Sequence, residues 1–126
     1  MIAEIGAFAA ALALVVAIAQ GVLGLSAAKR ESRANALAAT AQAGAALLVV
    51  AFVCLVAAFV RSDFSLAVVA ANSHIDKPLI YKIAGAWGNH EGSMLLWCLV
   101  SAASGAILAS VRGEQDAKLW SRAVGV

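Results

Sequence analysis

The residues best suited to chemistry stand together in one short run, WGNHEGS, in the second half of the chain. The run consists of Trp87, Gly88, Asn89, His90, Glu91, Gly92 and Ser93. A neutral imidazole can ligate a metal such as haem iron or accept a proton near neutral pH, so His90 is the first candidate for direct chemistry. The other histidine, His74, follows Asn72 and Ser73 in an ordinary polar turn and is the weaker candidate.

An architectural role explains most of the same run. Gly88 and Asn89 are typical turn residues, and Glu91 would lie near the N-terminus of a following helix, where the helix dipole favours a negative charge. His90 and Glu91 do not begin the HExxH motif of zinc proteases, because Met94 stands where the second histidine would be. The sequence therefore predicts no metal site and leaves His90 open between chemistry and loop structure.

The composition predicts a membrane protein. Of the 126 residues, 63% are hydrophobic and 13% charged, whereas about a quarter of the residues in a soluble domain are charged. The net charge of +2 is too small to indicate a nucleic-acid partner. Cys54 and Cys98 lie inside apolar runs without any metal or redox spacing, so we expect both to be small buried hydrophobic residues.

Three charge-free apolar runs are long enough to cross a bilayer, since about 20 helical residues span its hydrocarbon core. They cover residues 5–25, 36–60 and 93–111. A signal peptide is the alternative for the first run, but it would need a basic segment ahead of it, and the only charged side chain there is Glu4. We therefore expect an all-α integral membrane protein with three transmembrane helices. No acid or base lies inside these runs, which argues against a transporter.

Small and polar residues inside these runs predict contacts between helices. Small residues recur four apart in Ala39/Ala43, Thr40/Gly44 and Ser101/Gly105. Such pairs let helix backbones approach closely in a membrane. The polar residues within the runs are Gln20, Thr40, Gln42, Ser101 and Ser104. We expect them to form hydrogen bonds to neighbouring helices.

The basic residues indicate the orientation. They gather in the first connection and in the tail, as Lys29, Arg30 and Arg33 and as Arg112, Lys118 and Arg122. The positive-inside rule places both segments in the cytoplasm, and so places the N-terminus and the connection at about 61–92 on the opposite side.

This long connection contains a predicted short helix that lies on the membrane surface. Asp76 is a plausible N-cap, and Pro78 fits the first turn. Tyr81 has the amphipathic ring typical of the headgroup region. The apolar residues that would share one helix face are Leu79, Ile80, Ile83 and Trp87.

The segment KPLIYKIAGAWGNHEGSMLLW, residues 77–97, resembles the early signature of the CcmF and NrfE family of cytochrome c-type biogenesis proteins. The upstream RSDFSLAVVAANSH is similar to the family's segment before that signature, and the start MIAEIGAFAAALALVVAIAQ resembles its first helix. The resemblance covers essentially the whole chain as the N-terminal portion of such a protein.

The resemblance implies a multi-pass protein of the bacterial inner membrane that belongs to a haem lyase. In this family, haem delivered by the haem chaperone CcmE is attached to the CxxCH cysteines of apocytochrome c in the periplasm, with a CcmH-type subunit as a further partner. The N-terminus and the loop at about 61–92 would then be periplasmic and the C-terminus cytoplasmic. His90, His74 and Trp87 are the candidates for contact with haem or a partner.

The chain also departs from the family pattern. Family members are several times longer, and histidines near a tryptophan-rich WWD region hold their haem. Trp87, Trp97 and Trp120 form no such region, so this chain would not supply the haem ligands and its standing as an enzyme stays open. The alternatives are a split subunit that works beside a C-terminal CcmF-like polypeptide, a non-catalytic membrane scaffold, and a gene fragment without function.

Overall fold

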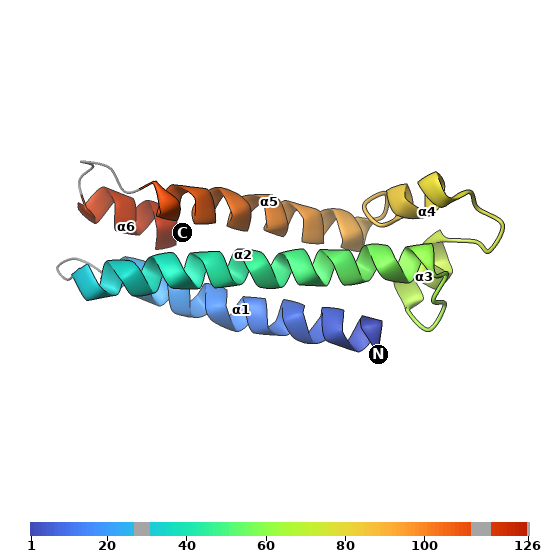
Figure 1. Ribbon diagram of the computed structural model, residues 1–126, viewed down its shortest axis with the longest axis horizontal. Helices are drawn as coiled ribbons and strands as arrows, with labels where there is room; N and C mark the ends of the chain where they lie inside the picture. The colour runs from blue at the N-terminus through green and yellow to red at the C-terminus, as the bar shows by residue number, and fades with distance from the viewer. Residues whose placement is uncertain (27–30, 112–116, 126) are drawn as a thin grey trace.

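The computed structural model describes residues 1–26, 31–111 and 117–125, and all regular structure within them is helical. The helices are α1 (Ile2–Ser26), α2 (Glu31–Val60), α3 (Ala67–Asn72), α4 (Leu79–Gly85), α5 (His90–Ser110) and α6 (Ala117–Gly125). Figure 1 shows α2 between α1 and α5, with α3 and α4 at one end and α6 at the other. The predicted all-α class is confirmed.

Three of these helices are long and apolar enough to cross a membrane, and the chain is a multi-pass membrane protein. The qualifying segments are Ile2–Leu25, Asn35–Val60 and His90–Ser110. The third begins three residues before the predicted residue 93, because the predicted start followed the edge of the apolar run, whereas the helix begins directly after its capping residue, Asn89. Residues 90–92 thus belong to α5 and not to the preceding loop.

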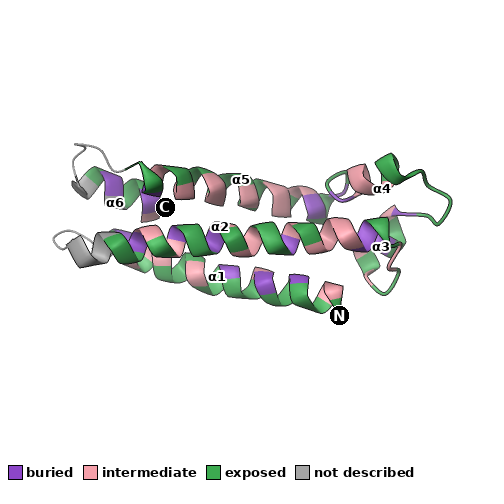
Figure 2. Cartoon of the chain, viewed as in Figure 1, coloured by how far each residue is buried: buried purple, intermediate pink, exposed green. Residues whose placement is uncertain are grey.

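The contact between α1 and α2 is built from small residues. Gly6, Ala9 and Ala13 are buried, whereas the large side chains of α1, such as Leu14 and Ile18, are exposed. A Cβ atom added to Gly6 would lie only 2.8 Å from the Cβ of Cys54, so glycine permits the close approach of the two helices. Figure 2 shows that the buried positions of α1 lie along the side that faces α2.

The predicted small-residue pairs have different surroundings. Gly44 is buried against α1, where an added Cβ would lie 3.6 Å from Cγ1 of Val16. Ala39 and Ala43 are both exposed, so this pair makes no comparable contact within the described residues. Spacing identifies a face on which helices can approach closely, but several faces of an alanine-rich helix carry the same spacing.

The polar residues inside the spans follow the prediction only in part. Gln20 of α1 donates a hydrogen bond to the carbonyl oxygen of Val124 in α6, and Gln42 of α2 donates to Oγ of Ser110 in α5 at 3.3 Å. The prediction is wrong for Thr40 and Ser104, whose hydroxyls donate to carbonyl oxygens of their own helices at 2.9 and 2.8 Å. A short hydroxyl side chain reaches its own preceding turn more easily than a neighbouring helix.

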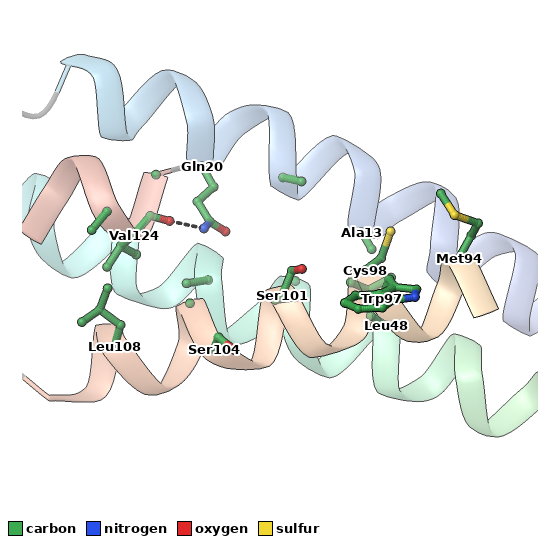
Figure 3. Close-up of a pocket in the computed structure, with 17 residues that line it drawn as sticks. Ala13, Gln20, Leu48, Met94, Trp97, Cys98, Ser101, Ser104, Leu108 and Val124 are labelled. Atoms are coloured by element: carbon green, nitrogen blue, oxygen red, sulfur yellow. Dashed lines mark hydrogen bonds between the residues drawn. The ribbon is translucent and has the colours of Figure 1, made fainter. Parts of the chain in front are cut away.

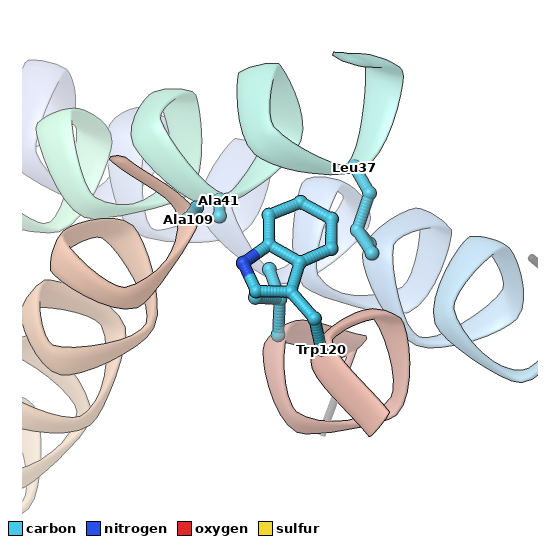
Figure 4. Packing of buried hydrophobic residues seen from close by; sticks show 5 residues of the cluster. Leu37, Ala41, Ala109 and Trp120 are labelled. Carbon is cyan, nitrogen blue, oxygen red and sulfur yellow. The ribbon is translucent and has the colours of Figure 1, made fainter. Parts of the chain in front are cut away.

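Helix α6 was not predicted from the sequence. Trp120 and Val124 stand four residues apart and are both buried, in a cluster with Leu37, Ala41 and Ala109. Figure 4 shows the Trp120 ring lying against α2 and α5. Its indole Nε1 donates a hydrogen bond to the carbonyl oxygen of Leu108 at 3.1 Å. These contacts hold α6 against the bundle at the end opposite α3 and α4.

The N-terminus and the connection between α2 and α5 lie at the same end of the bundle (Figure 1). Two membrane crossings, α1 and α2, separate them, so they lie on the same side of the membrane. Three basic residues used for the predicted orientation, Lys29, Arg30 and Arg112, lie outside the described residues.

Candidate functional site

The run WGNHEGS forms the junction between α4 and α5. Asn89 occupies the N-cap position of α5 with an extended backbone, and its side-chain oxygen accepts a hydrogen bond from the backbone N–H of Gly92 at 2.7 Å. This bond satisfies one of the free N–H groups of the first turn. Asn89 is 9% exposed, so its role in the described structure is architectural.

The same asparagine also binds α4. Its Nδ2 group donates a hydrogen bond to the carbonyl oxygen of Gly85, the last residue of α4, at 2.7 Å. One side chain therefore joins the C-terminus of α4 to the N-terminus of α5. Ser93 adds a local bond, since its hydroxyl donates to the carbonyl oxygen of His90 at 2.9 Å. Glu91 lies in the first turn of α5, as predicted.

Gly92 is buried because the backbone of the preceding turn lies directly against it. A Cβ added there would lie 1.7 Å from the carbonyl oxygen of Ala86 and 2.8 Å from its carbonyl carbon. No larger residue fits without moving one of the two backbone segments. The second glycine of the signature thus allows α4 and α5 to approach within a single tight turn.

A small hydrophobic core at the end of α2 packs against this junction. Ala58, Phe59, Val69 and Ala86 are essentially inaccessible to solvent and pack together. They come from α2, α3 and the α4–α5 turn. The Phe59 ring lies against Gly85, where an added Cβ would be 3.1 Å from the ring. The loop is therefore packed onto the end of α2.

The end of α2 is fixed by hydrogen bonds. Ser62 has a positive φ of 54°. The backbone N–H groups of Ser62 and Asp63 donate to the carbonyl oxygens of Phe59 and Ala58 at 3.1 and 2.9 Å, which is the Schellman pattern of helix termination. Lys82 of α4 donates from Nζ to Oγ of Ser62 at 2.7 Å, so α4 is also tied to the end of α2 by a polar contact.

Asp63 orders the turn that follows. Its carboxylate accepts hydrogen bonds from the hydroxyl of Ser65 at 2.6 Å and from the backbone N–H of Ser65 at 3.2 Å. The Ser65 hydroxyl, followed by its backbone N–H, lowers the pKa of Asp63 below its usual value. The carboxylate form thus holds this turn, and any stability it adds is lost as the pH falls through the lowered pKa.

The predicted contact residues point outward from this rigid base. Of these candidates, His74 and His90 are exposed and Trp87 is 42% exposed. Glu91, beside His90, is exposed as well. Large apolar residues are exposed beside them on α4 and the segment before it, namely Ile75, Leu79, Ile80 and Tyr81. The described residues contain no group of three or more histidine, cysteine, aspartate or glutamate side chains that could hold a metal. The arrangement can present an imidazole and an indole beside an apolar surface.

Two details differ from the sequence predictions. Pro78 occupies the N-cap position of α4, and the helix begins at Leu79 without a side-chain cap bond, so the predicted cap at Asp76 is wrong. The fixed φ of proline suits it to the helix start itself. Cys98 is exposed and only Cys54 is partly buried, so the burial predicted for both cysteines is wrong for Cys98. Cys98 faces an open space between α1 and α5.

The residues that hold the loop in place were not predicted from the sequence. Phe59 and Lys82 have ordinary identities, and no short-range pattern indicates that they meet the loop and the end of α2. Asn89 carried a usable signal, since asparagine just before an apolar run is a strong N-cap candidate. An N-cap at Asn89 predicts a helix that begins at His90, as α5 does.

Comparison with known proteins shows which proteins the chain resembles. It is 48% identical over its whole length to a cytochrome c-type biogenesis protein, Ccl1, of Rhodobacter capsulatus, and 49% identical to a CycK protein of Bradyrhizobium diazoefficiens. A CcmF protein of Pseudomonas aeruginosa is 48% identical over 79% of the chain. The chain is homologous to the N-terminal portion of the CcmF/NrfE family.

The match covers only part of each relative. The chain spans 20% of the length of the Rhodobacter protein, 19% of the Bradyrhizobium protein and 16% of the Pseudomonas protein. No family model matches the chain, and no solved structure does. The resemblance seen in the signature thus extends along the whole chain, while about four-fifths of each CcmF-like relative has no counterpart in it.

Proposed function

We propose that the chain acts in cytochrome c maturation as part of the haem lyase that attaches haem covalently to apocytochrome c. Its full-length match to proteins named for cytochrome c-type biogenesis is the observation that carries this proposal. The chain would contribute membrane helices and the connection between α2 and α5, residues 61–89. Its partners would be the haem chaperone CcmE, a CcmH-type subunit, apocytochrome c and a C-terminal CcmF-like polypeptide.

On this proposal the protein lies in the bacterial inner membrane, with the N-terminus and the loop in the periplasm and the C-terminus in the cytoplasm. The excess of basic residues in the first connection and in the tail supports this orientation. The exposed apolar residues Leu79, Ile80 and Tyr81 would lie at the membrane surface, close to the site of haem attachment.

The loop would serve as a rigid platform and not as the haem site itself. Asn89 and Gly92 are committed to joining α4 and α5, whereas His90 and Trp87 remain exposed. Exposed side chains on a fixed backbone are suited to contact with a partner, because the backbone does not have to be ordered when they are covered.

Replacing His90 by alanine tests this contact. In cells that produce the chain together with a polypeptide carrying the rest of a CcmF-like protein, we expect holocytochrome c to fall about tenfold, the effect of losing one good polar contact. His74→Ala removes the same kind of side chain elsewhere in the loop and should have a smaller effect. Equal, wild-type yields of holocytochrome c from both variants would contradict the contact.

A non-catalytic scaffold is the second candidate. The exposure of His90 and the commitment of Asn89 and Gly92 to the junction favour it, since both fit a loop that only positions other subunits. The purified chain, reconstituted with haem in detergent, would then show no stoichiometric low-spin Soret spectrum. A spectrum of that kind that disappears in His90→Ala would contradict the scaffold.

A further inference from the structure

An open trough runs between α1 and α5, and its floor is α2. It has a volume of about 590 Å³. Figure 3 shows its walls, which include Ala13 and Gln20 from α1 and Ser101, Ser104 and Cys98 from α5. We call this feature the α1–α5 trough. Most of its lining residues belong to the three candidate spans, so most of the trough lies within the membrane-spanning part of the chain.

One end of the trough already holds a helix. Val124 and Gly125 of α6 line the trough, and Gln20 donates a hydrogen bond to the carbonyl oxygen of Val124. An added Cβ on Gly125 would lie 2.5 Å from Cα of Gly24, so the backbones of α6 and α1 are in close contact. The trough therefore accepts a helix between α1 and α5, and among the described residues α6 fills only this end (Figure 3).

The open remainder has the lining that membrane helices use to pack. Ala13, Ala17 and Gly105 leave room for a backbone to approach closely. Ser101 and Ser104 are exposed in the wall, and a serine hydroxyl that donates to its own helix, as Ser104 does, can still accept a hydrogen bond. Trp97, which is 70% exposed, would cover the side of an incoming helix.

The three spans bury little of themselves against one another. Only 11%, 22% and 11% of the residues in their most apolar windows are buried. The relatives carry about four-fifths of their length beyond the region that this chain matches. These relatives thus contain further protein that is available to pack beside the matched helices.

We propose that the α1–α5 trough receives one transmembrane helix from the region that CcmF-like relatives carry beyond this chain. That helix would present a face of small residues, with a polar side chain at the level of Ser101 and Ser104. The α1–α5 trough would be the docking surface for the C-terminal CcmF-like partner, and this docking rests on the proposed function, which names that partner.

The test uses two alanines of α1 that are both exposed. Ala17 lines the trough and Ala19 does not. The affinity-tagged chain is produced with the remainder of the Rhodobacter capsulatus relative, extracted in a mild detergent and purified. We expect Ala17→Trp to lower recovery of the remainder about tenfold and Ala19→Trp to leave it unchanged, because only Ala17→Trp fills the space for the helix.

Two results would overturn the proposal: equal recovery of the remainder with both variants, or disulfide dimers of the chain through Cys98 in the presence of the remainder, which would show a second copy in the trough. Because both alanines are exposed, equal thermal unfolding of the two variants would show that folding is intact. Holocytochrome c is measured in the same cells. Loss of recovery in Ala17→Trp without any holocytochrome c in the wild type would sustain the docking and contradict the proposed function.

Discussion

Replacing Gly92 by alanine is expected to lower the free energy of unfolding by about 3 kcal/mol, the upper end of the usual cost of overpacking. The added Cβ would lie 1.7 Å from the carbonyl oxygen of Ala86. A backbone oxygen cannot move aside as a flexible side chain can, so the α4–α5 turn must separate from the first turn of α5. The hydrogen bonds of Asn89 to Gly85 and Gly92 would be weakened together.

Gly105→Ala is the matched control, because Gly105 lies in the same helix and an added Cβ there meets nothing within 4 Å. It should be neutral or slightly stabilising, since alanine favours a helix more than glycine does. Unfolding of the purified chain is followed by circular dichroism during titration with a denaturing detergent. Equal midpoints for Gly92→Ala and Gly105→Ala would contradict the tight junction.

Replacing Phe59 by alanine is expected to destabilise the chain by about 3–5 kcal/mol, the usual cost of removing a buried aromatic side chain. Phe59 is fully buried between Ala58, Val69 and Ala86, at the point where α2 supports the loop. The cavity would lie directly under Gly85. The substitution removes the core of the loop but leaves the contacts between the membrane spans in place. Proteases should therefore cleave the loop before the spans unfold.

The control for this variant is Phe64→Ala. Phe64 lies a few residues further along and is 41% exposed, so the same chemical change should cost far less. Limited proteolysis and the unfolding titration measure the two effects separately. Cleavage of Phe59→Ala and Phe64→Ala at the same rate within the loop would contradict the role of Phe59 in the loop core.

The membrane spans were predictable because the length and hydropathy of a membrane helix can be read directly from the sequence. Inside a bilayer, a charge-free apolar run of about 20 residues satisfies its own backbone hydrogen bonds as a helix, so hydropathy alone identified α1, α2 and α5. The helix ends were less predictable. Hydropathy placed the start of the third span at 93, whereas the cap at Asn89 begins the helix at His90. The local chemistry of the cap was the better guide.

The support of the loop could not be predicted, since it depends on contacts between residues far apart in the sequence. Nothing near Lys82 indicates that its Nζ meets Ser62, and nothing near Phe59 indicates that its ring packs on Gly85. Helix α6 is a similar case, because its burial depends on the Trp120 contacts with α2 and α5. For WGNHEGS, the architectural interpretation explains Asn89, Gly92 and Ser93, while the role of His90 stays a prediction.

Complementation tests most directly whether the chain takes part in haem attachment to cytochrome c. Cells that lack their own CcmF-like protein are supplied with a polypeptide carrying only the region beyond the matched fifth, with or without this chain, and covalent haem in cytochrome c is quantified by haem staining. We expect holocytochrome c to form only when both polypeptides are present, and Gly92→Ala to abolish most of the gain. Holocytochrome c at the same level without the chain would contradict the proposed role of the chain in the haem lyase.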